Sequence, residues 1–78
     1  MTQKQALTKP DLAALAKRFR QQAKKKRAEA ARDMGVAQTS IFNAEESPHQ
    51  SLLKLRVRMI EAYSPYRVIG PIFLLTKK

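Results

Sequence analysis

The chain has 78 residues, no cysteine, and 16 Lys and Arg against six Asp and Glu, for a formal net charge of +10. A chain of this length fits one domain, and folding buries only roughly 60% of its unfolded surface, so a second subunit would add stability. Without cysteine and with one histidine, no disulfide or structural zinc site can supply that stability. The charge predicts a polyanionic partner, with nucleic acid ahead of an anionic membrane surface.

Several classes of protein are disfavoured by the composition. No apolar run approaches the roughly 18 residues of a membrane span, and residues 1–5 lack the apolar stretch of an export signal. We therefore expect no membrane partner and a cytoplasmic, nucleoid-associated location. An enzyme is disfavoured because six acids and one histidine offer no nucleophile with a base and no phosphate-binding glycine loop. We expect no metal and no cofactor.

The spacing of apolar residues and of helix-ending signals predicts a mainly helical fold. Thr8 and Pro10 mark the start of the first helix, and Gly35 ends the second in a left-handed conformation that costs little without a Cβ. Residues 47–50 match a capping box with proline in the first helical position, which predicts the start of the fourth helix. In chain order, the expected elements are a flexible arm (1–9), four helices (about 10–25, 27–34, 38–46 and 48–63) and a C-terminal strand segment (64–78).

Positive charge is concentrated in the first half of the chain. Residues 1–36 hold ten Lys or Arg and three acids, a net +7, whereas residues 37–78 hold six and three, a net +3. A run of four cations lies where the first helix should end, and there it also complements the helix dipole by about 0.3 to 1 kcal/mol each. The run consists of Lys24, Lys25, Lys26 and Arg27, and we expect these residues to contact phosphates.

The segment from Gly35 to Glu45 is the most informative part of the chain, because it predicts a tight turn followed by a short helix with two different faces. Ile41 and Ala44 point to one side and are expected in the core. The opposite side carries amide, hydroxyl and aromatic groups, which can read base edges in the major groove of DNA. These outward residues are Gln38, Thr39, Phe42 and Asn43.

Each of these candidates has more than one interpretation. Gln38 can bond to adenine N6 and N7 or remain a solvated first-turn residue. Thr39 and Ser40 can bond to base, phosphate or their own backbone, and we assign Ser40 to phosphate. Phe42 can contact a thymine methyl group, pack on a neighbouring helix or stay exposed. His49 has no ligand partners near it in the sequence, so we expect a solvated side chain close to a phosphate.

Over about residues 12–63 the chain resembles the Cro and lambda-repressor (XRE-type) family of helix-turn-helix proteins. The matching residues are an Arg in the first helix, Ala28-Glu29-x-Ala31 in the second, Gly35, and Gln38-x-Ser40-Ile41-x-x-x-Glu45 in the third. The resemblance implies a four-helix DNA-binding domain over 10–63 with the third helix facing DNA. It also implies that Arg20 pairs with Glu45 across the core, and that Ala31 and Gly35 permit close helix crossing.

Three positions depart from the family pattern. Arg27 stands where the family often has a Gln that supports the reading helix, although Arg27 can still contact a phosphate. Ala37 stands where Ser or Thr is frequent, so the third helix has no side-chain N-cap, a loss of about 0.5 to 2 kcal/mol. The glycine that commonly follows the third helix is missing.

The C-terminal segment 64–78 is rich in β-branched and aromatic residues and predicts one strand, or two short ones separated at Gly70-Pro71. A strand this apolar aggregates unless it is covered. The resemblance implies that it pairs with a second copy across a two-fold axis, with two reading helices about 34 Å apart. The alternative is a monomer whose strand covers its own helices. The expected interface residues are Tyr66, Val68, Ile69, Ile72, Phe73, Leu74 and Leu75, followed by a solvated tail over 76–78.

The function favoured by these features is that of a bacterial or phage transcriptional regulator. It would act as a Cro-like repressor that binds a pseudo-palindromic double-stranded operator as a homodimer. An antitoxin-type regulator that also binds a protein toxin is a close variant. A basic RNA-binding protein is the alternative from another class, although only Phe42 could offer an aromatic stacking surface near the basic residues.

Overall fold

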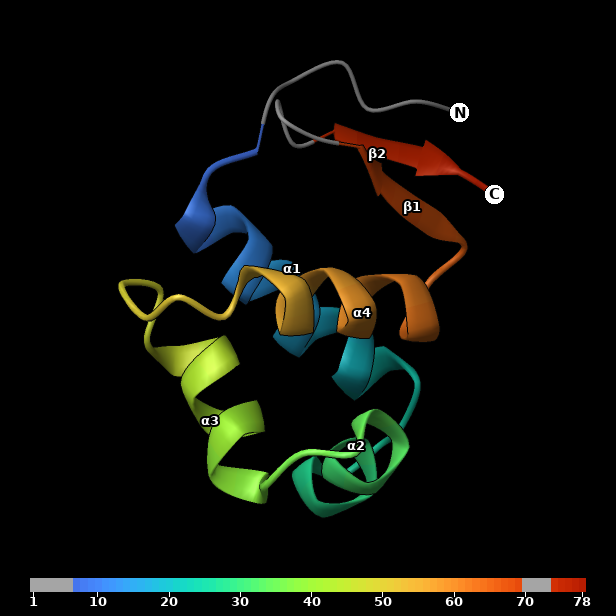
Figure 1. Cartoon of the computed structure of the whole chain (residues 1–78). Helices are drawn as coiled ribbons and strands as arrows, with labels where there is room; N and C mark the ends of the chain where they lie inside the picture. The colour runs from blue at the N-terminus through green and yellow to red at the C-terminus, as the bar shows by residue number, and fades with distance from the viewer. Residues whose placement is uncertain (1–6, 70–73) are drawn as a thin grey trace.

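The computed structural model describes residues 7–69 and 74–78, which form four helices followed by a hairpin of two antiparallel strands (Figure 1). The elements are α1 (Lys9–Gln22), α2 (Arg27–Met34), α3 (Gln38–Glu46), α4 (Leu53–Tyr63), β1 (Tyr66–Ile69) and β2 (Leu74–Lys77). The prediction of a mainly helical fold with a C-terminal strand or hairpin is confirmed, and the hairpin is the form that occurs. None of the helices in these two ranges is both long and apolar enough to cross a bilayer.

A capping box fixes the start of α1. The Thr8 hydroxyl accepts a hydrogen bond from the Asp11 amide at 3.3 Å, and the Asp11 carboxylate accepts one from the Thr8 amide at 2.8 Å. These bonds satisfy two amides that would otherwise lack partners in the first turn. The helix therefore begins at Lys9, inside the arm predicted for residues 1–9, of which residues 1–6 lie outside the described part.

The end of α1 is a Schellman turn built on a lysine. Lys24 has a left-handed backbone with φ 58°. Its amide donates to the Gln21 carbonyl at 3.0 Å, and the Lys25 amide donates to the Arg20 carbonyl at 3.1 Å. Glycine usually occupies this position because a Cβ is strained there. This turn ends the helix at Gln22, three residues before the predicted end.

The turn between α2 and α3 follows the prediction. Gly35 ends α2 with φ 69°, and its amide lies within hydrogen-bonding reach of the last turn of the helix. Val36 and Ala37 complete a three-residue connection, and Ala37 gives α3 no side-chain cap. Both helices have the predicted bounds, because the glycine stop and the short turn are signals local to the sequence.

The predicted start of the fourth helix at residues 47–50 is wrong, because α4 begins at Leu53. The carbonyls of Ser47 and Gln50 accept hydrogen bonds from the Arg56 guanidinium at 2.8 and 3.1 Å. The Ser47 carbonyl also accepts from the Gln50 amide at 3.0 Å, which closes a tight turn. The segment therefore folds around a side chain from the next helix and does not continue into a helix of its own.

The core lies where the four helices meet and where the hairpin covers them. Small side chains on α1, α2 and α3 allow close crossing, and larger ones come mainly from α4. Its buried members are Leu12, Ala16, Ala30, Ala31, Met34, Ile41, Ala44, Leu55, Met59, Ile60 and Leu75.

The hairpin packs on the helices of its own chain. Val68 lies opposite Leu75 in the register, and Leu75 is only 3% exposed because it enters the helical core. The Tyr66 ring stacks at a tilt on Phe19 of α1, with ring centroids 5.9 Å apart. Ile69 is 42% exposed.

The packing of the hairpin bears on the residues that we expected in a dimer interface and in a C-terminal tail. Tyr66, Val68 and Leu75 of the expected dimer interface contact their own core, whereas Ile72 and Phe73 lie outside the described residues. The predicted tail over 76–78 is wrong in part, because Thr76 and Lys77 belong to β2 and pair with β1, although Lys77 and Lys78 are exposed as expected.

Candidate nucleic-acid interface

The two faces of α3 differ in chemistry, as expected. Ile41, Ala44 and Glu45 are buried, whereas Gln38 and Thr39 are exposed. The other two candidates for base contacts are also accessible, since Phe42 is 46% exposed and Asn43 is half-buried. In Figure 1, α3 lies beside α2, on the far side of the molecule from the hairpin.

An ion pair ties the buried face of α3 to α1. Arg20 Nε lies 2.5 Å from Glu45 Oε2, and Arg20 Nη2 donates to Glu45 Oε1 at 3.0 Å. Arg20 Nη1 also donates to the Lys25 carbonyl at 2.7 Å. Both charged groups are buried, so the fork-shaped contact offsets the cost of removing them from water. The pair implied by the family resemblance is therefore present.

Arg27 lies in the same network. Its Nε donates to Glu45 Oε1 at 3.0 Å, and its Nη2 donates to Glu46 Oε2 at 2.8 Å. Lys17 Nζ contacts the same Glu46 oxygen at 2.7 Å. The carbon at the centre of the Arg27 guanidinium lies 4.9 Å from the centroid of the Phe42 ring. Two carboxylates thus neutralise the residue that we expected at a phosphate.

A shallow hollow opens between the start of α2 and the first turns of α3. It is lined by Arg27, Gln38, Thr39 and Phe42, so it combines one guanidinium, one amide, one hydroxyl and one aromatic ring. We expected Gln38, Thr39 and Phe42 at base edges and Arg27 at a phosphate. Asn43 lies outside this lining.

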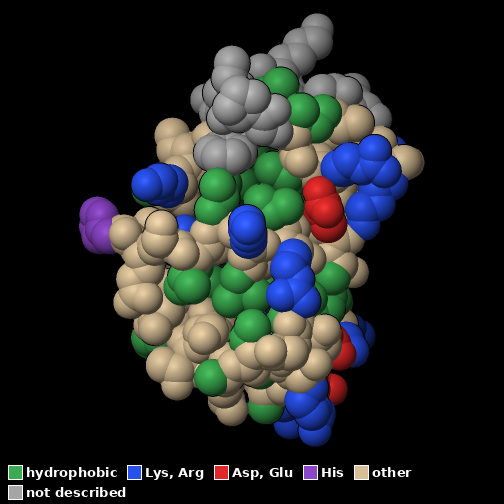
Figure 2. Space-filling view, in the orientation of Figure 1, with side chains coloured by type: hydrophobic (Ala, Val, Ile, Leu, Met, Phe, Trp, Pro, Cys, Tyr) green, Lys and Arg blue, Asp and Glu red, His purple; other side chains and the backbone are tan. Residues whose placement is uncertain are grey.

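The remaining residues expected at phosphates lie in different surroundings. Lys24 and Lys26 are exposed, and neither has a carboxylate partner within the described ranges. Lys25 lies 3.5 Å from Asp33 and is partly neutralised. His49, purple in Figure 2, is exposed in the loop between α3 and α4.

Ser40 lines a different hollow from Gln38, Thr39 and Phe42. It is half-buried and lines a second hollow together with the start of α4. The lining of that hollow is otherwise Val36, Ser51, Leu52, Leu53, Lys54, Leu55 and Arg58. The structure therefore places Ser40 apart from Gln38, Thr39 and Phe42.

All six side-chain carboxylates have partners within the fold. Three of them accept hydrogen bonds from backbone amides: Asp11 from Thr8, Glu29 from Lys26, and Glu61 from Val68. The other three bind side chains: Asp33 binds Tyr63 and Lys25, Glu45 binds Arg20 and Arg27, and Glu46 binds Lys17 and Arg27. Hydrogen bonds from Thr8, Tyr63 and Lys17 lower the pKa of Asp11, Asp33 and Glu46 respectively. Because the acids serve the fold, most of the surface cations among the described residues have no carboxylate partner. Figure 2 shows Lys and Arg side chains at several places on one face.

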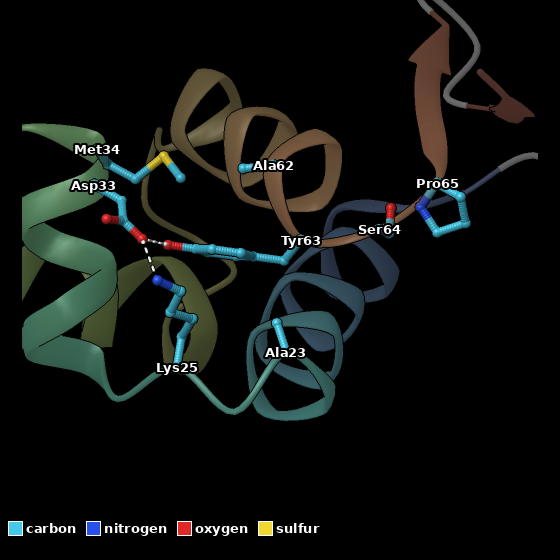
Figure 3. Close-up of a pocket in the computed structure, with 8 residues that line it drawn as sticks. All are labelled: Ala23, Lys25, Asp33, Met34, Ala62, Tyr63, Ser64 and Pro65. Atoms are coloured by element: carbon cyan, nitrogen blue, oxygen red, sulfur yellow. Dashed lines mark hydrogen bonds and ion pairs between the residues drawn. The ribbon is translucent and has the colours of Figure 1, made fainter.

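A third hollow, between α2 and the end of α4, contains a cluster of three polar side chains (Figure 3). The Tyr63 hydroxyl donates to Asp33 Oδ2 at 2.6 Å, and Lys25 approaches the same oxygen. Burial and this hydrogen bond raise the pKa of Tyr63. The cluster fastens α4 to α2 and to the loop after α1, and its walls include no residue of α3 among those described.

Arg56 is the residue that the sequence analysis missed. It is 1% exposed, and it donates to the carbonyls of Ala44 at 2.9 Å, Ser47 at 2.8 Å and Gln50 at 3.1 Å. Burial lowers its pKa. A signal was present, since Arg56 follows Leu52 by four residues and precedes Met59 by three, which places it on the apolar stripe of the helix.

Comparisons of the chain with protein families, with curated proteins and with solved structures found no match. Among the residues with described positions, no group of three His, Asp or Glu side chains is arranged to hold a metal ion. The outward surface of α3 is therefore the feature of the described structure that points to a function.

Proposed function

We propose that this protein binds double-stranded DNA in a sequence-specific manner through the outward face of α3, and that it regulates transcription. The observation that carries the proposal is the exposed amide, hydroxyl and aromatic group of Gln38, Thr39 and Phe42 on one helix face. Amides and hydroxyls match the donors and acceptors of base edges, and a short helix after a three-residue turn fits the width of the major groove.

The electrostatics support a polyanionic partner. The chain has ten more cations than acids, and every acid is engaged within the fold. In this proposal Lys24 and Lys26 contact phosphates, because both are exposed and free of carboxylates in the described structure. Arg27 is not among the phosphate contacts, since Glu45 and Glu46 already bind its guanidinium.

A homodimer is part of the proposal. Ile69 is exposed on the hairpin, and burial of this side chain against a second copy would add apolar contact to a small domain. Leu75 is not assigned to that interface, because it is buried in its own core. Sedimentation of the protein alone, and with a duplex that carries an inverted repeat, tests this part. A monomer under both conditions would contradict it.

The experiment that tests the proposal is selection of bound sequences from randomised duplex DNA. We expect an enriched motif for the parent protein. We expect Gln38→Ala to weaken binding to that motif by about 1 to 3 kcal/mol and to relax the choice at one base pair of each half-site. Gln22→Ala is the matched control, because Gln22 is also an exposed helical glutamine but lies on α1. Equal effects of the two variants, or no enriched motif, would contradict the proposal.

Salt dependence tests the assignment of phosphate contacts. Lys24→Ala and Lys26→Ala should each lower the slope of log affinity against log salt by about one unit, with unchanged sequence preference. Arg27→Gln should leave the slope unchanged. The same selection with single-stranded RNA is the control for partner class, and tighter RNA binding than duplex binding would favour an RNA-binding protein.

A further inference from the structure

Phe42 and Ile69 are the large hydrophobic side chains that the described structure leaves exposed, and of these Phe42 lies in the proposed reading face. An exposed aromatic ring contributes to binding only if it is held in place, because ordering a free side chain costs conformational entropy. Its neighbours therefore decide what Phe42 can do.

A chain of contacts fixes the ring from the core outward. Phe42 packs against the Arg27 guanidinium at 4.9 Å, and Glu45 and Glu46 each hold one nitrogen of that guanidinium. Glu45 has no exposed side-chain surface and is itself bound by Arg20. The stacking covers part of the ring, and the remainder faces solvent beside the amide and hydroxyl of the hollow. The ring is thus a fixed apolar surface within a polar face.

The major groove presents one apolar group, the methyl group on C5 of thymine. The same methyl group occurs on 5-methylcytosine. We propose that Phe42, positioned by Arg27, binds the 5-methyl group of a pyrimidine, so that each half-site favours this methyl group at one position. This inference rests on the proposed function, because it names the chemical group that the same surface would recognise.

The spacing along α3 also predicts where that pyrimidine lies. Phe42 follows Gln38 by four residues, which places it on the same helix face and about 6 Å further along the axis. Successive base pairs are about 3.4 Å apart in duplex DNA. The methyl group should therefore lie one or two base pairs from the base that Gln38 reads.

The test uses the motif obtained by selection, with each thymine replaced in turn by 2′-deoxyuridine, which removes only the methyl group. We expect the parent protein to lose about fourfold in affinity at one position, as for one buried methyl group. Phe42→Ala should bind the thymine duplex more weakly and should not distinguish the two duplexes at that position. In a duplex with cytosine there, methylation of C5 should restore binding to the parent but not to Phe42→Ala.

Two further variants separate a recognition role from a structural one. Arg27→Gln should reduce the ratio of thymine to deoxyuridine affinity, because the ring loses the support of the guanidinium. Gln22→Ala is the control, since it removes an exposed helical side chain on α1 and should leave that ratio unchanged. Thermal melting of each variant checks that it is folded.

The outcomes distinguish this inference from the proposed function. Sequence-specific binding without any deoxyuridine effect that depends on Phe42 would overturn the inference and leave the proposed function standing. Absence of sequence-specific duplex binding would overturn both. A deoxyuridine effect that persists in Phe42→Ala would assign methyl recognition to another residue and would also overturn the inference.

Discussion

Two buried arginines hold α3 in place, and they are satisfied in different ways. Arg20 reaches from α1 to the Glu45 carboxylate, so its positive charge meets a negative one. Arg56 reaches from α4 to three backbone carbonyls at and beyond the end of α3, and none of its hydrogen-bond partners is an acid. The surroundings of Arg20 form an ion-pair network, which we call the ion-pair region. The surroundings of Arg56 form a cap on the end of α3, which we call the Arg56 region.

The difference shows how a buried guanidinium can be stabilised without a counterion. The last carbonyls of a helix have no amide partners and carry a partial negative charge. The planar fork of arginine provides five N–H donors, so Arg56 can bind the carbonyls of Ala44, Ser47 and Gln50 at once. Three backbone carbonyls therefore do for Arg56 what the Glu45 carboxylate does for Arg20.

A large loss of stability is expected from removing Arg56. Arg56→Ala removes the side-chain hydrogen bonds to three carbonyls and opens a cavity, and we expect a loss of about 4 kcal/mol in the free energy of unfolding. Arg56→Lys keeps the charge but not the fork, and should lose about half as much. Urea denaturation followed by circular dichroism measures both. A lysine variant as stable as the parent would show that charge alone suffices at this position.

Glu45→Ala is expected to lower the free energy of unfolding by about 3 to 5 kcal/mol, because it leaves Arg20 and Arg27 without their shared carboxylate. Replacing both partners, Arg20→Met with Glu45→Met, should restore a large part of the loss. No second side-chain substitution can do this for Arg56, since its partners are backbone atoms. Equal thermal midpoints for the parent and Glu45→Ala would contradict a stabilising role for the pair.

Acid should weaken the ion-pair region and spare the Arg56 region. A hydrogen bond from Lys17 lowers the pKa of Glu46 in the folded state. Stabilisation from a carboxyl with a lowered pKa is complete above its unfolded pKa and is lost as the pH falls through the folded value. Unfolding free energy measured from about pH 5 down to about pH 2 should therefore fall, and less steeply in Glu46→Gln. Arg56→Lys should have the slope of the parent, and a flatter slope would contradict the comparison.

The sequence was sufficient where the signals are local. The Gly35 stop, the missing cap at Ala37 and the bounds of α2 and α3 depend on neighbouring residues. The Arg20 and Glu45 contact required a family resemblance, because the partners are 25 positions apart. Base reading by α3 stays a prediction.

Contacts to backbone atoms could not be predicted in the same way. Arg56 binds backbone carbonyls, which every residue has, so no pattern of side chains indicates which ones it binds. The start of α4 was therefore predicted too early in the chain. The carboxylates on Arg27 were missed for a different reason. An isolated charge run predicts solvent or phosphate as the partner, whereas the fold brings Glu45 and Glu46 to the start of α2.

The smallest expected effect concerns the turn after α1, whose Lys25 carbonyl accepts a hydrogen bond from Arg20. Lys24 holds a left-handed backbone there with φ 58°, so Lys24→Gly should relieve strain and raise the free energy of unfolding by about 0.5 to 1 kcal/mol. Lys24→Ala removes the same charge but keeps the Cβ, and should give no such gain.

Gly35→Ala is the reverse substitution, because it adds a Cβ at a left-handed position that has none. A Cβ at Gly35 would meet no atom within 4 Å, so its expected loss of about 1 kcal/mol reports backbone strain alone. If Lys24→Gly melts no higher than Lys24→Ala, the lysine turn is not strained. If it melts higher and also binds duplex DNA more weakly at low salt, then Lys24 is retained at this turn for its charge, at a cost in stability.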